Sequence, residues 1–316
     1  MQLGMIGLGR MGANIVRRLM KDGHDCVVYD VNQEAVATLA GEGATGAATL
    51  ADFAGKLQAP RAVWLMIPAG LTGEVVEQLA AVLDEGDIII DGGNSNYRDD
   101  VRRAKRLREH GIHYVDVGTS GGVFGLDRGY CLMVGGPEEA VAAITPVLET
   151  IAPGPGDIPR TPGRTGDYAP EERGFLHCGP SGAGHFVKMV HNGIEYALMQ
   201  AWAEGYELLE AKDELIHDVT GVFKAWQRGT VVRGWLLELL VKALEEDPEF
   251  TDIEGYVEDS GEGRWTVEEA LNNAVPVPTI SASIFARFVS RQDDSPAMKA
   301  VAALRKQFGG HAVRKA

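Results

Sequence analysis

Short apolar runs alternate with amphipathic segments through the first half of the chain. The apolar runs cover residues 3–6, 26–29, 62–67, 87–91 and 114–117. Runs this short and this continuous are typical of strands that are buried on both faces. Their alternation with helical segments predicts a doubly wound α/β fold, a parallel sheet with helices on both sides.

The second half of the chain has a helical pattern. Residues 152–174 precede it and hold five prolines and five glycines, so we expect an irregular loop there and one last short strand at 176–178. We predict two domains, an α/β domain over residues 1–175 and an all-α domain over residues 176–316. Five segments keep a helical apolar period: 184–212, 235–244, 266–272, 283–289 and 297–307.

The first apolar run leads into a glycine-rich turn. The turn consists of Gly7, Leu8, Gly9, Arg10, Met11 and Gly12, which have the G-x-G-x-x-G spacing. In a Rossmann-type site the first glycine allows a tight turn, the second lets the backbone approach a pyrophosphate, and the third lets the helix pack closely on its strand. The N–H groups at the helix start attract phosphate. A Rossmann-type dinucleotide site is therefore predicted, with a purely structural glycine turn as the alternative.

An acidic residue ends the next apolar run. Asp30 lies 18 positions after Gly12 and is followed by Val31 and Asn32. A carboxylate there can accept hydrogen bonds from the ribose hydroxyls, whereas a 2′-phosphate would meet like charge and no arginine. We therefore expect NAD as the cofactor in preference to NADP.

Further turns follow the other apolar runs. Ligands of open parallel sheets bind beyond the carboxyl ends of the strands, where these turns are expected to lie. Each turn taken alone is equally well explained as an ordinary turn. Together they predict that Ile67, Pro68 and Ala69 face the cofactor. The other turn residues, Asn94, Ser120, Gly121 and Gly122, are expected to border the ligands.

One predicted helix carries several ionisable groups on one face. Lys188 and Asn192 are four residues apart, as are His191 and Glu195, so all four lie along one stripe of the helix. A cation, an imidazole, an amide and a carboxylate on one face favour acid–base chemistry on a polar substrate. The alternative is a solvated helix face with one ion pair.

Composition narrows the possible functions. The net charge of −15 argues against general binding to nucleic acid or anionic membranes, which requires a basic surface. No apolar run approaches the roughly 20 residues that span a bilayer, and no secretory leader is recognisable. Cys26, Cys131 and Cys178 are far apart and odd in number, as expected of free thiols in the cytoplasm. The eight histidines show no metal-ligand spacing, so no metal is expected.

Taken together, the motifs resemble those of the 6-phosphogluconate dehydrogenase family, in its short NAD-dependent form, within the β-hydroxyacid dehydrogenase superfamily. The Lys-x-x-His-Asn-x-x-Glu-Tyr core at 188–196 is the specific part of the resemblance. The match covers nearly the whole chain: GLGRMG at 7–12, DGGNS at 91–95, SGG at 120–122, GAGHFVKMVHNGIEY at 182–196, GRWT at 263–266, FAR at 285–287 and FGGH at 308–311.

This resemblance implies an oxidative decarboxylation. 6-Phosphogluconate would give hydride from C3 to NAD and then lose CO2, and the enediol would be protonated at C1 to yield ribulose 5-phosphate. Lys188 matches the family's general base at the hydroxyl, and Glu195 matches its general acid at C1. His191 and Asn192 complete the implied catalytic set.

Substrate contacts are implied by the same resemblance. His191, Asn192, Asn94 and Ser120–Gly122 match groups that hold the sugar acid. At the phosphate end the matching residues are Tyr196, Arg287, Arg305 and His311, of which the last two come from a neighbouring subunit in the family.

The sequence departs from the family pattern in two places. Ser260 stands where the family usually has a phosphate-binding lysine. The common long form also has a second helical repeat, which is absent here, so we expect a homodimer or homotetramer whose tail reaches the neighbouring active site.

Two other functions compete with this hypothesis. One is a β-hydroxyacid dehydrogenase acting on a small unphosphorylated hydroxy acid, for which the cations at 287, 305 and 311 would be unnecessary. The other is a non-catalytic NAD-binding regulator, which would not need the Lys188 to Glu195 face.

Overall fold

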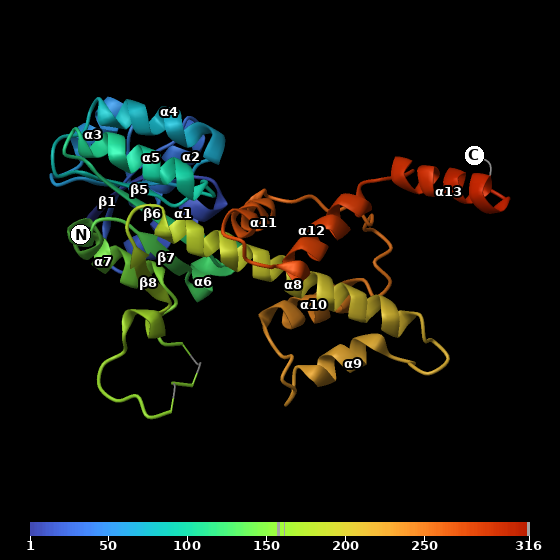
Figure 1. Cartoon of the computed structure of the whole chain (residues 1–316). Helices are drawn as coiled ribbons and strands as arrows, with labels where there is room; N and C mark the ends of the chain where they lie inside the picture. The colour runs from blue at the N-terminus through green and yellow to red at the C-terminus, as the bar shows by residue number, and fades with distance from the viewer. Residues whose placement is uncertain (157–158, 161, 315–316) are drawn as a thin grey trace. The chain divides into compact units, whose positions relative to one another are not determined.

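The computed structural model describes residues 1–156, 159–160 and 162–314. The chain forms two compact units, Met1–Lys188 and Met189–Ala316, and the division falls inside the long helix α8, Ala183–Glu210 (Figure 1). The expected domain boundary at 175/176 stays a prediction. The strand expected at 176–178 is present as β8, Phe175–Gly179, and it belongs to the sheet of the first unit.

The first unit is built on one sheet with the order β3-β2-β1-β4-β5-β6-β7-β8. Its other strands are β1 Gln2–Ile6, β2 Asp25–Tyr29, β3 Thr45–Gly46, β4 Ala62–Leu65, β5 Ile88–Asp91, β6 His113–Ser120 and β7 Cys131–Gly135. Its other helices are α1 Arg10–Lys21, α2 Gln33–Gly41, α3 Leu50–Lys56, α4 Ala69–Ala80, α5 Tyr97–Arg108, α6 Gly125–Arg128 and α7 Glu138–Ile151, with 3₁₀ turns at Gly122–Phe124 and Pro170–Arg173.

The first six strands have the order of a Rossmann fold, which confirms the predicted fold class. Every pairing is parallel except that of β6 with β7. The sheet is therefore parallel, as expected, apart from this one pair of strands. The apolar run at 132–134 that forms β7 lies between Gly129 and Gly135, and the chain turns back along β6 through the short α6.

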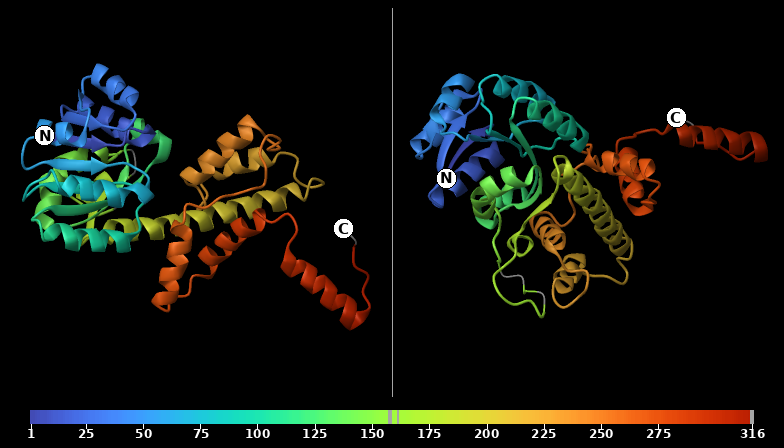
Figure 2. Two further views of the ribbon diagram at one scale, coloured as in Figure 1. Left: turned by 90° about the horizontal axis from the view of Figure 1, so that it is seen from above. Right: turned by 60° about the vertical axis from the view of Figure 1, so that its left-hand side comes forward.

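Side chains alternate between the two faces of the sheet and build one core on each. Trp64 and Ile90 lie on the face packed against Ile15 of α1 and Ile144 of α7. Their neighbours Val63, Leu65 and Ile89 lie on the other face, with apolar residues of α3, α4 and α5. This two-residue alternation is what a strand buried on both sides requires, and Figure 2 shows the helices above and below the strands.

The second unit is helical, as predicted. A small core at Phe223, Leu237 and Val241 joins α9 to α10 and contacts Trp202 of α8. Thr266 of α11 donates a hydrogen bond to the Met189 carbonyl oxygen at 2.8 Å, so α11 packs closely on α8. Its helices after α8 are α9 Val219–Trp226, α10 Trp235–Glu246, α11 Glu262–Asn272, α12 Pro278–Ser290 and α13 Pro296–Gly309.

Two smaller findings complete the fold. The helix α9 was missed from the sequence because it is short and contains Gly221. Across the described ranges, no helix combines the length and apolar character that crossing a bilayer demands.

Candidate active site

The carboxyl ends of the central strands meet at one edge of the sheet. Ile6 of β1 pairs with Leu65 of β4, and Leu65 pairs with Asp91 of β5. Asp91 pairs in turn with Asp116 of β6, a strand that continues to Ser120. The glycine-rich turn and the turns after β4, β5 and β6 therefore leave the sheet at the same edge, as predicted. Ligands of this fold bind at that edge.

The three glycines of the first turn differ in what a side chain would meet at each position. Gly7 has φ of +93°, and a Cβ there would collide with the Met66 carbonyl oxygen. A Cβ on Gly12 would collide with the Gly7 carbonyl oxygen. A Cβ on Gly9, in contrast, would meet no protein atom within 4 Å. The protein itself does not require glycine at position 9, so this residue fits the role of leaving room for a dinucleotide phosphate.

Asp30 holds the glycine-rich turn from the end of β2. Its Oδ2 accepts a hydrogen bond from the Leu8 N–H at 2.6 Å, and its Oδ1 accepts one from the Asn32 N–H at 2.8 Å. The carboxylate is thus fixed beside the turn and keeps lone pairs for a further donor. This arrangement fits a carboxylate that accepts a hydrogen bond from a ribose hydroxyl of a bound dinucleotide.

The turns after β4 and β5 lie against each other. Pro68 precedes the first residue of α4, Ala69. A Cβ on Gly93 would come within 2.9 Å of the Ile67 carbonyl oxygen. The structure therefore places Ile67 against the turn that carries Asn94.

Lys188 lies at the same edge and is nearly buried. Its Nζ donates a hydrogen bond to Asn94 Oδ1 at 2.7 Å, and the residue is 5% exposed. A Cβ on Gly118 of β6 would come within 2.5 Å of the Lys188 Cβ, so this glycine lets α8 pass directly over the strand. The structure thus unites two residues that the sequence places 94 positions apart.

The turn after β6 follows two residues beyond Gly118. Gly121 and Gly122 have φ of +151° and +53°, which are conformations that favour glycine. A Cβ on Gly121 would touch Tyr130, whereas one on Gly122 would meet nothing within 4 Å. The turn therefore has one packed glycine and one glycine that borders open space.

The remaining members of the predicted catalytic set follow Lys188 on α8. His191 Nδ1 lies 2.9 Å from Asn192 Oδ1 and 3.9 Å from Glu195 Oε2. The His191 and Glu195 side chains are 40% and 39% exposed, so a ligand can reach both. Helical spacing places them one and two turns after Lys188.

Tyr196 and Arg287 lie together in the helical unit. The Arg287 guanidinium lies 3.5 Å from the centroid of the Tyr196 ring. The Tyr196 hydroxyl accepts a hydrogen bond from the Ser260 N–H at 3.0 Å and lies 3.0 Å from Ser260 Oγ. Ser260 stands where the resemblance led us to expect a lysine, and it therefore offers Tyr196, a predicted phosphate-binding residue, a neutral hydroxyl.

The other two residues that are predicted to bind the substrate phosphate lie near the end of the chain. Arg305 is on α13 and His311 follows it, and both are exposed. The structure of the single chain does not bring them to other predicted site residues, which agrees with the expectation that they act on a neighbouring subunit but does not test it.

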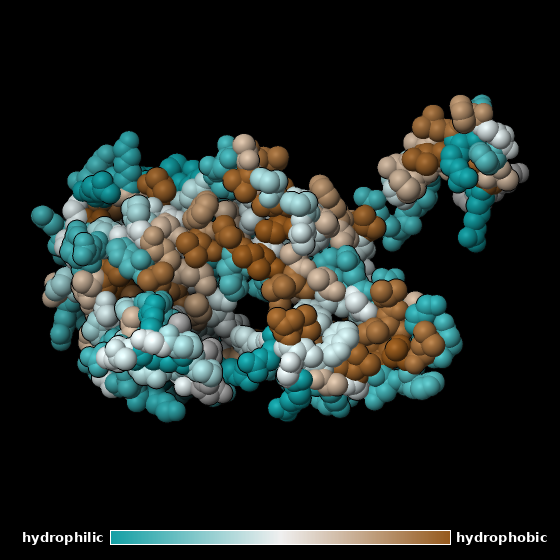
Figure 3. Space-filling model, turned by 60° about the horizontal axis from the view of Figure 1, so that its bottom comes forward, coloured by the Kyte–Doolittle hydropathy of each residue, from teal (hydrophilic) through white to brown (hydrophobic). Residues whose placement is uncertain are grey.

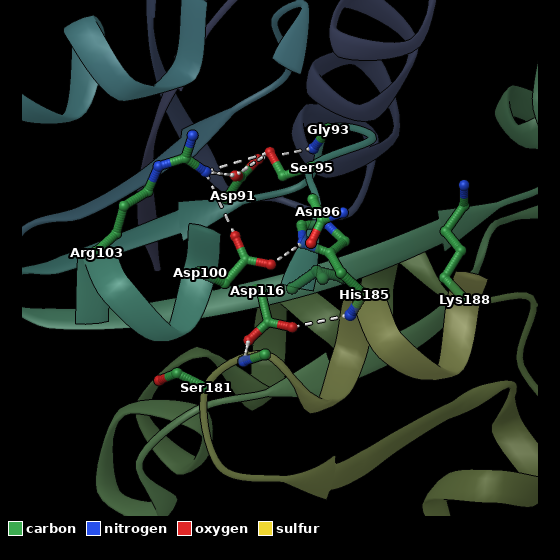
Figure 4. A network of polar contacts seen from close by, with 12 residues as sticks. Asp91, Gly93, Ser95, Asn96, Asp100, Arg103, Asp116, Ser181, His185 and Lys188 are labelled. Carbon is green, nitrogen blue, oxygen red and sulfur yellow. Dashed lines mark hydrogen bonds and ion pairs between the residues drawn. The ribbon is translucent and has the colours of Figure 1, made fainter. Parts of the chain in front are cut away.

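The structure adds a buried charged network that was not predicted (Figure 4). Arg103 NH1 lies 3.3 Å from Asp91 and 3.5 Å from Asp100. Asp100 also lies 2.7 Å from His185 Nδ1. Asp116 accepts hydrogen bonds from the backbone N–H groups of Gly182, which precedes α8, and of His185, in the first turn of α8.

Burial and mutual charge shift the pKa values of this network. Burial opposes a charge on His185, but the charge and hydrogen bond of Asp100 and the charges of Asp91 and Asp116 together outweigh that effect and raise the pKa of His185 to about 9. Burial raises the pKa of Asp116 to about 6, against the opposing effect of His185. At neutral pH the network therefore contains an imidazolium ion as well as a guanidinium ion.

Asp91, Asp100 and His185 also have ligand atoms within 4.8 Å of one another, which is close enough for a metal. Arg103 contacts both carboxylates, so a protein cation already occupies the position between them. The expectation that the chain binds no metal stays a prediction.

Both halves of the chain are similar to known proteins. Residues 2–158 match the family model for the NAD-binding domain of 6-phosphogluconate dehydrogenase, and residues 184–314 match the model for its C-terminal domain. The solved structure of Plasmodium falciparum 6-phosphogluconate dehydrogenase is 27% identical with a TM-score of 0.79, over 100% of this chain and 66% of that one.

Two relatives match along essentially their whole length. A Haloferax volcanii protein named as an NAD-dependent, decarboxylating 6-phosphogluconate dehydrogenase is 44% identical over 318 residues, covering 100% of this chain and 99% of its own. The Bacillus subtilis protein YqeC, which is named only provisionally as a 6-phosphogluconate dehydrogenase, is 42% identical over 315 residues and 100% of both chains. The chain therefore belongs to the 6-phosphogluconate dehydrogenase family.

Proposed function

We propose that the chain catalyses the NAD-dependent oxidative decarboxylation of 6-phosphogluconate to ribulose 5-phosphate and CO2. The observation that carries the proposal is the contact of Lys188 with Asn94 at the edge of the sheet where the glycine-rich turn also lies. A nearly buried amine beside a dinucleotide site is well suited to take a proton from an alcohol while its carbon is oxidised. The name of the Haloferax relative supports the same reaction.

Each step assigns work to a residue of this chain. NAD, when bound, supplies the hydride acceptor. Lys188 Nζ takes the proton of the C3 hydroxyl, and the resulting ammonium polarises the C3 carbonyl oxygen while the C1 carboxylate leaves as CO2. Asn94 orients the lysine through their 2.7 Å hydrogen bond.

Glu195 is proposed to finish the reaction by protonating C1 of the enediol. His191 lies 3.9 Å from the Glu195 carboxylate and 2.9 Å from Asn192, which supports a role in orienting both side chains. Asn192 and the turn at Ser120–Gly122 are proposed to hold the sugar hydroxyls and the carboxylate.

The phosphate end of the substrate is assigned to Tyr196, Ser260 and Arg287. Arg287 supplies the positive charge, and the hydroxyls of Tyr196 and Ser260 supply donors. Arg264 and Arg291 are less available, because both pair with Asp259, and the hydrogen bond from Arg264 lowers the pKa of that carboxyl.

The proposal is tested by initial rates of NADH formation with 6-phosphogluconate and with gluconate. The proposed function requires a clear preference for the phosphorylated acid. Equal or better turnover of gluconate or of 3-hydroxyisobutyrate would instead support a dehydrogenase of small unphosphorylated hydroxy acids.

We also propose that NAD is preferred over NADP. Asp30 is held beside the glycine-rich turn by Leu8 and Asn32, where a 2′-phosphate would meet its negative charge. We expect kcat/KM to be at least about tenfold higher with NAD, a difference of about 1.4 kcal/mol. Measuring kcat/KM for both cofactors at saturating substrate checks this, and a ratio in favour of NADP would contradict it.

A homodimer or larger homo-oligomer is the proposed assembly. In α13, a helix with no buried residue, Leu304 and Phe308 are 68% and 97% exposed, and hydrophobic residues, in brown, are visible on this helix at the upper right of Figure 3. On α8, Ile194 and Leu198 are about half exposed. An amphipathic helix without a covered apolar face requires a partner surface.

Light scattering should give at least twice the 33.9 kDa mass of one chain. A monomer at assay concentration would contradict the proposed assembly.

A further inference from the structure

The turn that carries Asn94 is fixed from below by the residue that ends β5. Asp91 Oδ1 accepts a hydrogen bond from the Gly93 N–H at 3.1 Å, and Asp91 Oδ2 accepts one from Ser95 Oγ at 2.6 Å. Asp91 and Ser95 are both buried. The residues on either side of Asn94 are therefore anchored to the same carboxylate.

The anchor continues from Asp91 to α5. The Tyr114 hydroxyl lies 2.9 Å from a carboxylate oxygen of Asp91 and 2.9 Å from one of Asp100. Arg103 lies within 3.5 Å of both carboxylates. A shared hydroxyl and a shared guanidinium ion thus connect the end of β5 to Asp100.

The same chain of contacts then reaches α8. Asp100 Oδ2 lies 2.7 Å from His185 Nδ1, and Asp116 Oδ2 accepts a hydrogen bond from the His185 N–H at 2.8 Å. His185 precedes Lys188 by three residues, or about one turn of helix. Lys188 closes the ring of contacts by donating its hydrogen bond to Asn94.

We propose that His185 is a positioning residue for Lys188: its contact with Asp100 fixes the first turn of α8 and so holds the lysine amine at Asn94. This inference rests on the proposed function, because it assumes that Lys188 takes a proton from the substrate. His185 itself touches no reacting atom.

Geometry and charge favour this role over simple core packing. His185 is 3% exposed and Asp100 is 0% exposed, so the pair is shielded from water and holds a defined geometry. Three carboxylates, Asp91, Asp100 and Asp116, face two cations, Arg103 and His185, and an uncharged side chain at 185 would leave Arg103 alone to balance them. An apolar side chain of similar size could fill the space but could not orient the helix.

The test compares His185→Asn, which retains an N–H donor near the position of Nδ1, with His185→Leu, which has none. The exposed His110→Asn is the matched control. Below the unfolding temperature of every variant, kcat should fall about 100-fold in His185→Leu, the usual cost of a misplaced catalytic group. The loss should be smaller, about tenfold, in His185→Asn. KM for NAD should stay within about twofold, because the glycine-rich turn is not part of the network.

Two results would overturn the inference. One is a kcat within twofold of wild type in both variants while only the unfolding temperature falls, which would show that His185 serves stability alone. The other is a large rise in KM for NAD with kcat unchanged. If His185→Leu does not fold, His185→Asn decides alone by the same criteria.

A readout without turnover separates this inference from the proposed function. Crystal structures of the wild type and of a folded variant should show the distance from Lys188 Nζ to Asn94 Oδ1, 2.7 Å here, lengthened beyond hydrogen-bond reach in the variant. If the wild type fails to oxidise 6-phosphogluconate but the distance is still longer in the variant than in the wild type, the proposed function is refuted and the positioning role stands. An unchanged distance would refute the positioning role whatever the activity.

Discussion

Replacing Lys188 with methionine is expected to abolish both NADH formation and CO2 release. Methionine has nearly the length of lysine and no basic nitrogen, so it removes the group that takes the hydroxyl proton and later polarises the ketone. General acid–base catalysis alone contributes about 10²–10⁴-fold, and Lys188 serves two steps. We therefore expect kcat to fall by at least about 10³-fold, measured by NADH absorbance and by trapped CO2.

The matched control is Lys105→Met, which removes an exposed lysine of the same unit from α5. NAD should bind Lys188→Met with wild-type affinity, since the glycine-rich turn and Asp30 are unaltered. Near-normal turnover in Lys188→Met would remove this residue from the mechanism.

Replacing Glu195 with glutamine should have the second-largest effect. The amide has the shape of the carboxyl group but cannot donate a proton to C1, so the enediol must be protonated by water. We expect kcat to fall by about 10²–10⁴-fold, the usual contribution of a positioned acid. The KM for 6-phosphogluconate should change little, because a carboxylate adds no attraction for an anionic substrate.

The exposed Glu207→Gln on the same helix serves as control. Comparing NADH formed in a single turnover with ribulose 5-phosphate released would show whether the loss lies after hydride transfer. A kcat equal to that of wild type would remove Glu195 from its assigned role.

The fold was largely predictable because its strands are buried on both faces. Such strands appear in the sequence as short continuous apolar runs, and the turn at Gly7–Gly12 and the acid at Asp30 identify the Rossmann order. The antiparallel β7 was missed, although its apolar residues 132–134 are as regular as those of other strands. Whether β7 runs parallel or antiparallel to β6 depends on the length of the segment that connects them. The connection through α6 is too short to return the chain to the start of β6, as a parallel pairing would require.

The individual site residues could be predicted, but the contacts between them required the structure. Lys188 and Asn94 each have a sequence signal, and only the crossing of α8 over Gly118 shows that they meet. Asp116 lies within an apolar run and His185 is on the buried side of α8, so no pattern separates them from packing residues. Their role became visible once β5, β6, α5 and α8 were placed together.

The coupling of oxidation to decarboxylation on one substrate is the main feature of the proposed reaction. It is tested most directly with 6-phosphogluconate labelled with carbon-13 at C1, by measuring labelled CO2 and NADH in the same reaction. We expect the two to form in equal amounts, with ribulose 5-phosphate as the sugar product. NADH without labelled CO2, or no NADH with this substrate, would contradict it.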